Sequence, residues 1–237
     1  MKISLINAGK RFNRDWIFRN FNYGFTSGTA YAITGPNGSG KSTLLQVIGG
    51  AMMMSEGKAK YEVGSQKSEV GGRIACPPAG GSERESGTPQ SAVSIETKEV
   101  SVDQAFQYIA IAAPYLELIE EMTVTEFLQF HGQFKSFLPE LTIPKIIAEI
   151  GLQNAAHKQI RYYSSGMKQR VKLAQAIFSN VPCVLLDEPC TNLDATGIGL
   201  YHRLIDSYCT NRLVIVSSND EQEYSFCKEK IDILSYK

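Results

Sequence analysis

Gly35-Pro36-Asn37-Gly38-Ser39-Gly40-Lys41-Ser42 is the stretch that decides the fold of this chain. It satisfies the phosphate-binding pattern G-x-x-x-x-G-K-[ST] at every fixed position. Residues 31–34 before it predict a short buried strand, and residues 44–48 after it predict a helix. Because glycines let backbone N–H groups approach a polyphosphate, and the helix N-terminus adds partial positive charge, the stretch predicts a nucleotide-binding loop. The alternative, a glycine-rich turn with an incidental lysine, explains neither the strand nor the helix.

The polar side chains of this loop have specific expected roles. Lys41 would reach the β- and γ-phosphates of a bound nucleotide, and the hydroxyl of Ser42 would ligate Mg²⁺. Backbone N–H groups of the loop would point at the anionic oxygens. The predicted nucleotide-binding residues of this segment are Gly35, Pro36, Asn37, Gly38, Ser39, Gly40, Lys41, Ser42 and Thr43.

An apolar stretch that ends in two acids, Val184-Leu185-Leu186-Asp187-Glu188, predicts a second part of the same site. A carboxylate at the end of a strand can hold Mg²⁺, and the next acid can polarise an attacking water. Asp187 is therefore a predicted metal ligand together with Ser42, and Glu188 is a predicted catalytic residue. Taken alone, the stretch also suits a strand that runs into a polar turn at Pro189.

A third motif, Tyr163-Ser164-Ser165-Gly166-Met167, precedes the helical run 168–176. It resembles the signature L-S-G-G-Q of the ATP-binding cassette (ABC) ATPases. Asp187-Glu188-Pro189, followed by Thr191-Asn192-Leu193-Asp194, resembles the Walker B segment and D-loop of that family. The resemblance extends over nearly the whole chain. It implies one ABC nucleotide-binding domain over residues 1–237, with ATP and Mg²⁺ as cofactors.

The resemblance also implies partners and a location. Ser164 and Gly166 would cap the γ-phosphate of ATP held by a second nucleotide-binding subunit, in a homodimer or a heterodimer. Hydrolysis would drive an integral membrane permease, so the subunit would be cytoplasmic and peripheral on the cytoplasmic face of the inner (plasma) membrane. A helix N-cap formed by Ser164 or Ser165 is the structural alternative for the same residues.

The first two departures from the family pattern concern the signature and a missing glutamine. Tyr163, Ser165 and Met167 replace three signature residues, whereas the two residues expected to touch phosphate are retained. No Gln follows the strand predicted over 106–111, where the family has one that helps to bind Mg²⁺ and passes motion to the permease.

The other two departures concern single side chains. Asn219 stands where the family has a His, which makes it the second predicted catalytic residue. The aromatic ring expected against adenine is Phe12, with Trp16 as the alternative. Either ring could instead be a core residue, because aromatic side chains bury large areas whatever their role.

Composition excludes several classes of protein. Lys+Arg and Asp+Glu both number 24, and this balance argues against a nucleic-acid partner. No apolar run approaches the ~20 residues needed to cross a bilayer, so another chain would span the membrane. The five cysteines form no C-x-x-C pair, and an odd number indicates neither a zinc site nor a disulfide framework.

The predicted fold class is α/β, with a P-loop NTPase core and a mostly parallel sheet. Residues 1–60 alternate apolar and polar and predict an N-terminal antiparallel β subdomain. Residues of about 64–100 contain no aromatic side chain and are rich in Gly, Ser and Pro from Gly64 to Ser94, which predicts a flexible insertion. Residues of about 120–165 predict an α-helical subdomain, opened by the capping box Thr123-Val124-Thr125-Glu126. Helices are predicted at 166–180, 195–208 and 220–228, and strands at 183–187, 213–217 and 231–234.

Two other functions remain open from the sequence. A degenerate cassette could bind ATP structurally with little hydrolysis, which the missing Gln and His favour and Lys41 and Glu188 oppose. A soluble ABC ATPase outside transport usually has two cassettes or a long coiled coil, and this chain has one cassette and no sustained heptads. We therefore expect an ATPase that drives transport and hydrolyses ATP slowly.

Overall fold

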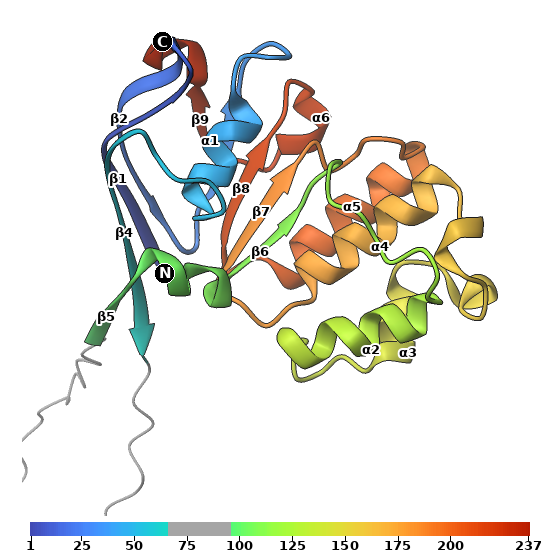
Figure 1. Ribbon diagram of the computed structural model, residues 1–237. Coiled ribbons are helices and arrows are strands. Elements are labelled where there is room, and N and C mark those ends of the chain that lie inside the picture. Colours follow the sequence, from blue (N-terminus) through green and yellow to red (C-terminus); the bar gives the residue numbers. More distant parts are fainter. Residues whose placement is uncertain (66–95) are drawn as a thin grey trace, which may run out of the picture.

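The computed structural model describes residues 1–65 and 96–237, and they form two sheets with helices between and beside them (Figure 1). The predicted α/β class is confirmed, with one antiparallel sheet and one parallel sheet. No helix within these two ranges is long and apolar enough to cross a membrane.

The antiparallel sheet has the strand order β2-β1-β4-β5. Its inner face is apolar because side chains alternate across each strand, and the rings of Phe18, Phe21 and Phe25 are fully buried there. This sheet is the predicted N-terminal β subdomain. Its strands are β1 (Lys2–Phe12), β2 (Asp15–Thr26), β4 (Glu56–Ser65) and β5 (Glu96–Val100).

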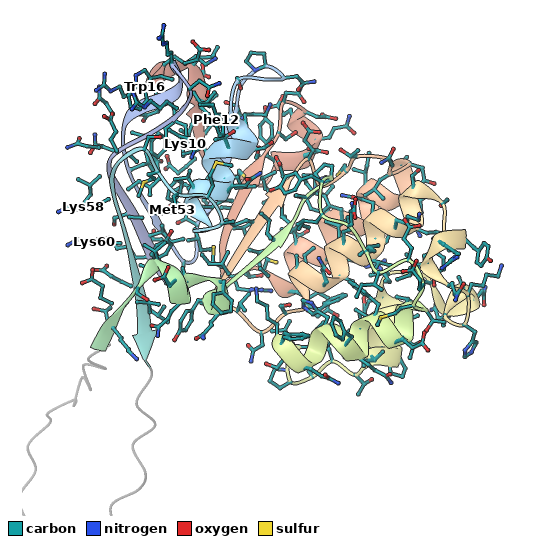
Figure 2. All side chains as sticks on the ribbon, in the orientation of Figure 1. Lys10, Phe12, Trp16, Met53, Lys58 and Lys60 are labelled. Carbon is teal, nitrogen blue, oxygen red and sulfur yellow. The ribbon has the colours of Figure 1, made fainter. Side chains whose placement is uncertain are left out.

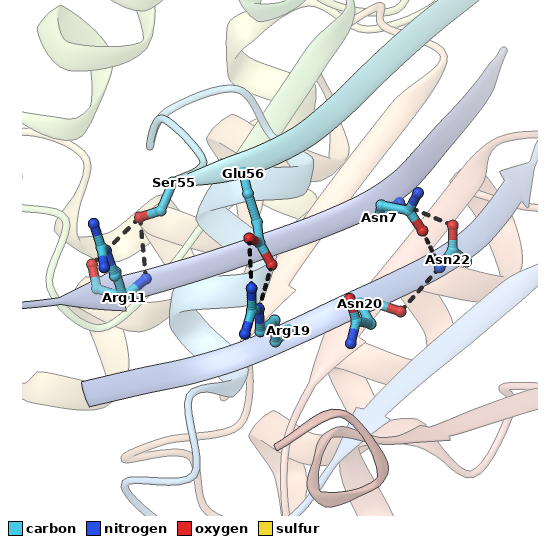
Figure 3. A network of polar contacts seen from close by, with 7 residues as sticks. All are labelled: Asn7, Arg11, Arg19, Asn20, Asn22, Ser55 and Glu56. Atoms are coloured by element: carbon cyan, nitrogen blue, oxygen red, sulfur yellow. Dashed lines mark hydrogen bonds and ion pairs between the residues drawn. The ribbon is translucent and has the colours of Figure 1, made fainter. Parts of the chain in front are cut away.

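Polar contacts on the outer face of this sheet connect β1, β2 and β4 (Figure 3). The guanidinium of Arg19 donates to both carboxylate oxygens of Glu56, at 2.7 and 3.2 Å. The N–H of Asn7 donates to Asn22 at 2.8 Å, and the amide of Asn22 donates back at 2.9 Å. Exposed pairs of this kind add little stability, so their main effect is to favour one register of the strands.

The second sheet is parallel throughout, in the order β6-β7-β8-β3-β9. Every residue of its second and third strands is buried, as expected for apolar strands covered on both faces. All carboxyl ends meet at one edge, which is where ligands bind in open α/β sheets. The strands are β3 (Ala30–Thr34), β6 (Ile109–Ala112), β7 (Cys183–Asp187), β8 (Leu213–Ser217) and β9 (Glu229–Asp232).

Helices cover both faces of the parallel sheet. Helix α1 (Lys41–Ile48) lies between the two sheets, and its Leu44 and Leu45 are fully buried in their shared core (Figure 1). Burial of each such side chain stabilises the fold by about 1.5–3 kcal/mol. Helices α4 (Ser165–Ile177) and α5 (Ala195–Tyr208) pack on the opposite face, in a second core.

A helical part packs beside α4, as predicted. It contains α2 (Val124–Phe134) and α3 (Ile143–Glu149). The predicted capping box is confirmed, because the N–H of Glu126 donates to Thr123 Oγ1 at 3.2 Å and the N–H of Thr123 donates to Glu126 Oε2 at 2.8 Å.

The strand predicted over 106–111 begins later than expected. Residues Val102–Tyr108 form a 3₁₀ helix, and β6 starts at Ile109, where pairing with Cys183 of β7 begins. Phe106 is 61% exposed, so its apolar character does not reflect a place in the sheet. Only the last part of the apolar run has a neighbouring strand to pair with.

The C-terminal elements are also shifted. The helix predicted over 220–228 is the single turn α6 (Glu221–Tyr224), and the strand predicted over 231–234 runs from Glu229 to Asp232. The chain must leave the helix early because Glu229 pairs with Tyr31 of β3. Within the range of about 64–100 that predicts an insertion, β4 reaches Ser65 and β5 begins at Glu96; residues 66–95 lie outside the described residues.

Candidate nucleotide-binding site

The loop at 35–42 connects β3 to α1 at the carboxyl edge of the parallel sheet. Gly40 is the residue before the helix and has φ +104°. A Cβ there would lie 2.2 Å from Cγ2 of Ile17, so both the backbone conformation and the packing require glycine. At Gly35, φ is +142° and a Cβ would lie 2.9 Å from Ser39 Oγ. The loop is therefore wrapped tightly in front of the helix N-terminus.

Lys41 is buried within this loop, with 4% of its surface exposed. Its ammonium group donates to the carbonyl of Gly35 at 3.0 Å and to that of Pro36 at 3.3 Å. These bonds hold the positive charge of the ammonium group inside the loop, where it would contact a bound polyphosphate. The hollow beside the loop has a volume of about 220 Å³ and is lined by Ile17, Asn37, Gly38, Gly40, Lys41, Ser42, Thr43 and Glu188.

Asp187 ends β7 next to this hollow and is 2% exposed. Burial raises the pKa of its carboxyl group, while Ser217, Ser42 and the charge of Lys41 oppose the rise. Its Oδ1 atom is buried and has no hydrogen-bond partner among the described residues. A buried carboxylate oxygen without a donor, near a serine hydroxyl, fits the oxygen ligands that Mg²⁺ prefers.

Glu188 follows at once and has φ +43°, in the left-handed region that non-glycine residues rarely adopt. Its N–H donates to Ser217 O at 2.9 Å, and its carbonyl accepts from the N–H of Thr191 at 3.1 Å. These two bonds hold the strained backbone in place. They leave the Glu188 side chain lining the hollow beside the loop. Backbone strain imposed by surrounding structure is a feature of functional sites.

Asn219 lies two residues beyond the end of β8, and its side chain is exposed. The neighbouring Ser218 is buried, and its N–H donates to Ile33 O at 3.1 Å. This bond ties the segment after β8 to the strand that leads into the phosphate-binding loop. Asn219 is therefore at the same edge of the sheet as Glu188.

The signature segment opens helix α4. Ser164 is the N-cap, and its hydroxyl oxygen accepts from the N–H of Met167 at 3.3 Å. Ser164 therefore caps the helix, which is the structural alternative to a phosphate contact. Because its hydroxyl oxygen is the acceptor in the capping bond, its hydroxyl proton can still donate to an anion. A Cβ on Gly166 would lie 2.9 Å from Asn192 O, so the D-loop packs closely against this position. A second hollow, of about 430 Å³, lies here.

The structure also explains two of the replaced signature residues. Tyr163 is buried, and its hydroxyl donates to Ala155 O at 2.8 Å, which anchors the helical part to the start of α4. Ser165 is the first residue of α4 and lines the second hollow together with Met167.

The two candidate adenine-stacking rings have different surroundings (Figure 2). Phe12 is 47% exposed, so it is not a core residue, and the Lys10 ammonium lies 5.0 Å from its ring centre. Trp16 has the guanidinium groups of Arg11 and Arg19 at 5.6 and 4.4 Å from its ring. Phe12 therefore has the more accessible face.

Sequence reasoning missed two residues at this site. Ile17 packs against Gly40 and lines the hollow beside the loop. Tyr115, three residues after β6, has a pKa raised by burial and by the nearby charge of Asp187, and its hydroxyl interacts with the side chain of Gln46 on α1. The sequence does offer one indication that Tyr115 belongs to the site, namely its position just after a strand. The carboxyl ends of neighbouring parallel strands lie at the same edge of the sheet, so residues that follow them lie close together.

A contact between elements connects the signature helix to the segment that follows β7. Gln169 of α4 is buried, and its amide donates to Pro189 O at 2.8 Å. Arg170, the next residue, lies 3.7 Å from the carboxylate of Asp194. The signature helix, Glu188 and the D-loop are therefore parts of one packed unit.

Comparison with known families and structures agrees with this arrangement. The ABC transporter family model matches residues 18–191, and the chain belongs to that family. It is 24% identical to the uncharacterized ABC transporter ATP-binding protein YybJ of Bacillus subtilis, over 95% of this chain and 89% of the relative. It is 26% identical to the cytochrome c biogenesis ATP-binding export protein CcmA of Agrobacterium fabrum, over 93% of this chain and 90% of the relative.

Solved structures show the same fold. The dimeric bacterial ABC transporter cassette MJ0796 matches with a TM-score of 0.71 and 19% identity, over 98% of this chain and 94% of that chain. An ATP-binding subunit of an ABC transporter matches with a TM-score of 0.73 and 18% identity, over 98% of this chain and 86% of that chain. The protein is thus an ABC ATP-binding cassette with a P-loop core.

Proposed function

We propose that this protein hydrolyses ATP between two nucleotide-binding subunits and thereby drives a separate membrane permease. The observation that carries the proposal is the hollow that Lys41, Ser42 and Glu188 line together, beside the buried carboxylate of Asp187. A cation, a hydroxyl and two acids at one helix N-terminus are the groups that phosphoryl transfer to water requires.

Each residue has one role in this proposal. Lys41 and the N–H groups at the start of α1 bind the β- and γ-phosphates. Ser42 and Asp187 hold Mg²⁺, which offsets the negative charge of the phosphates when bound. Glu188 accepts a proton from the attacking water, and Asn219 donates its amide N–H to the transferring phosphoryl group. Phe12 supports the adenine ring.

The site is completed by the signature segment of a second subunit. Ser164 and Gly166 lie at the N-terminus of α4, beside a hollow of about 430 Å³ that is separate in its lining from the hollow at Lys41. Within one subunit the two hollows have no lining residue in common, so we infer that the signature acts on the nucleotide of the partner. The inference is supported by MJ0796, which is described as a dimeric cassette.

Transport is the function that the relatives favour. YybJ is named as an ABC transporter ATP-binding protein, and CcmA as an ATP-binding export protein. In this chain, the connection from β6 through Tyr115 to α2 joins the catalytic edge to the helical part. We propose that closure of the two subunits moves this connection against the permease.

The test is the variant Glu188→Gln, which keeps the size of the side chain and removes its basicity. We expect hydrolysis to fall by at least 10²-fold and an ATP-dependent dimer to accumulate, measured by phosphate release and by light scattering after size exclusion. Glu99→Gln, at an exposed position of β5, is the matched control and should behave as wild type. Hydrolysis unchanged in Glu188→Gln would refute the assignment of the catalytic acid.

A further inference from the structure

Glu223 is a buried acid that the proposed function does not use. It lies in α6, the single turn after Asn219, and is 5% exposed. Burying a carboxylate is unfavourable unless hydrogen bonds compensate it, and here one oxygen, Oε2, has no partner among the described residues. Burying this carboxylate therefore costs free energy, and an apolar side chain would fill the same space without that cost.

The other carboxylate oxygen of Glu223 binds the chain just after the catalytic acid. Its Oε1 atom accepts the N–H of Cys190 at 2.7 Å, a buried bond, and Cys190 is two residues beyond Glu188. A bond of this length from an N–H to a carboxylate is charge-assisted and stronger than one between neutral groups.

The backbone of Glu223 is also fixed. Its carbonyl accepts from the hydroxyl of Tyr201, a fully buried residue of α5, at 2.8 Å. On the N-terminal side, Asp220 donates its N–H to Ser218 Oγ at 2.9 Å and accepts from the N–H of Gln222 at 3.0 Å. The turn from Ser218 to Glu223, which includes Asn219, is therefore anchored at both ends.

The segment 188–190 is held from two sides as a result. Gln169 of α4 donates to the carbonyl of Pro189, and Glu223 of α6 accepts from the N–H of Cys190. Glu188 itself is bonded through its backbone to Ser217 and has a strained φ of +43°. A residue in such a conformation keeps it only while the surrounding bonds persist.

We propose that Glu223 is a positioning residue for ATP hydrolysis, which locks the segment carrying Glu188 to the turn carrying Asn219. The proposal rests on the proposed function, because it concerns the geometry of that catalytic site. The carboxylate acts by bonding the Cys190 amide and does not contact nucleotide. When this bond is removed, the position of Glu188 relative to Asn219 is no longer fixed, whereas the phosphate-binding loop is unchanged.

Charged and titratable groups surround Glu223 on several elements. Burial is the main cause that raises its pKa, and the charges of Asp220 and Glu188 act in the same direction. The side chain of Ser218 and the N–H of Cys190 oppose the rise, and the phenol of Tyr201 is coupled to the same carboxyl. The carboxyl group of Glu223 therefore lies in surroundings that disfavour its ionised form.

The experiment compares Glu223→Asp with Glu223→Gln in the full chain. Asp withdraws the acceptor from Cys190 by one methylene, whereas Gln keeps an oxygen at the same reach. We expect the Asp variant to lower kcat by about tenfold or more with less than about a twofold change in KM for ATP, since small misplacements at a catalytic group reduce the rate of the chemical step. The Gln variant should retain kcat within about threefold. Glu221→Asp, an exposed acid on the same turn paired with Lys230, is the control.

A second measurement does not depend on turnover. Hydrogen exchange of the Cys190 amide, without nucleotide, should be at least about tenfold faster in Glu223→Asp than in Glu223→Gln, because only the Asp variant loses the acceptor. Equal exchange in the two variants would overturn the proposal, and so would a wild-type kcat in the Asp variant. If wild type itself did not hydrolyse ATP, the proposed function would fail, and the exchange rates alone would decide whether Glu223 holds the segment.

Discussion

At the scale of single residues, the candidate site combines strain with buried charge. Glu188 is held in a left-handed conformation by bonds to Ser217 and Thr191, and Lys41 is held under its loop by two carbonyls. Each arrangement costs free energy that the surrounding packing offsets. Residues held in this way need little reorganisation when substrate binds, which is an advantage for electrostatic catalysis.

Lys41→Ala should weaken nucleotide binding without unfolding the protein. The substitution removes the cation at the β/γ-phosphates, and a hydrogen bond to a charged group contributes about 1.5–3 kcal/mol, or roughly 10- to 150-fold in affinity. Titration with a fluorescent ATP analogue measures the change. Lys60→Ala, at an exposed position of β4, should bind as wild type does. Wild-type affinity in the Lys41 variant would exclude the loop as the phosphate site.

Asn219→His should raise kcat with little change in the affinity for ATP. An amide donates one neutral hydrogen bond, whereas an imidazolium donates a charge-assisted one, and removing a transition-state donor typically costs ~10²–10³ in rate. Conversely, Asn219→Ala should hydrolyse ATP more slowly than wild type. Steady-state kinetics of both variants, with Asn211→His at another exposed asparagine as control, test the assignment. An Ala variant as fast as wild type would remove Asn219 from the mechanism.

At the scale of elements, the site is formed by the ends of neighbouring strands. The ends of β7, β8 and β3 supply the acids, the segment with Asn219 and the phosphate-binding loop. Helix α4 adds its own connection, since Gln169 reaches the segment after β7. The helical part packs on α4, and its stability affects how firmly the signature segment is held.

Thr123→Ala should destabilise the helical part by removing the N-cap of α2. Loss of such a cap costs about 1 kcal/mol, which corresponds to roughly 2–4 °C in Tm for a chain of this size. Thr125→Ala, two residues further inside the same helix, should not lower Tm, because Ala has the higher helix propensity. Calorimetry of the two variants distinguishes the lost cap from a general effect of removing threonine.

At the scale of the whole molecule, two apolar cores enclose the parallel sheet, and buried ionisable groups lie at its carboxyl edge. One core lies between the sheets around α1, and the other lies under α4 and α5. Asp187 and Glu223 are both buried acids whose pKa is raised chiefly by burial. Their ionised forms are therefore less favourable in the folded state than in the unfolded chain.

This sign predicts how stability depends on pH. Glu223 binds its proton more tightly in the folded state, so its contribution is greatest at low pH and falls as pH rises from the ordinary pKa of 4.5 through its raised pKa. Glu223→Gln, which cannot ionise, should gain stability relative to wild type as pH increases. Urea unfolding at about pH 5 and pH 8 measures the difference. A gain that is larger at the lower pH would contradict the direction of the shift.

The sequence by itself determined the features that depend on short-range pattern. The phosphate-binding loop, the buried strand ending at Asp187 and the capping box at Thr123 are all local, because glycine content, apolar runs and cap residues act within a few positions of the chain. The order of these motifs also indicated the ABC family.

Only the tertiary structure decided the features that depend on neighbours distant in sequence. The strand expected from residue 106 begins at Ile109, because a strand exists only where another strand pairs with it. Tyr115 approaches Asp187 across 72 positions of the chain, and Glu223 reaches Cys190 across 33. No local pattern encodes such contacts, since the packing of elements on both faces of the sheet brings these side chains together.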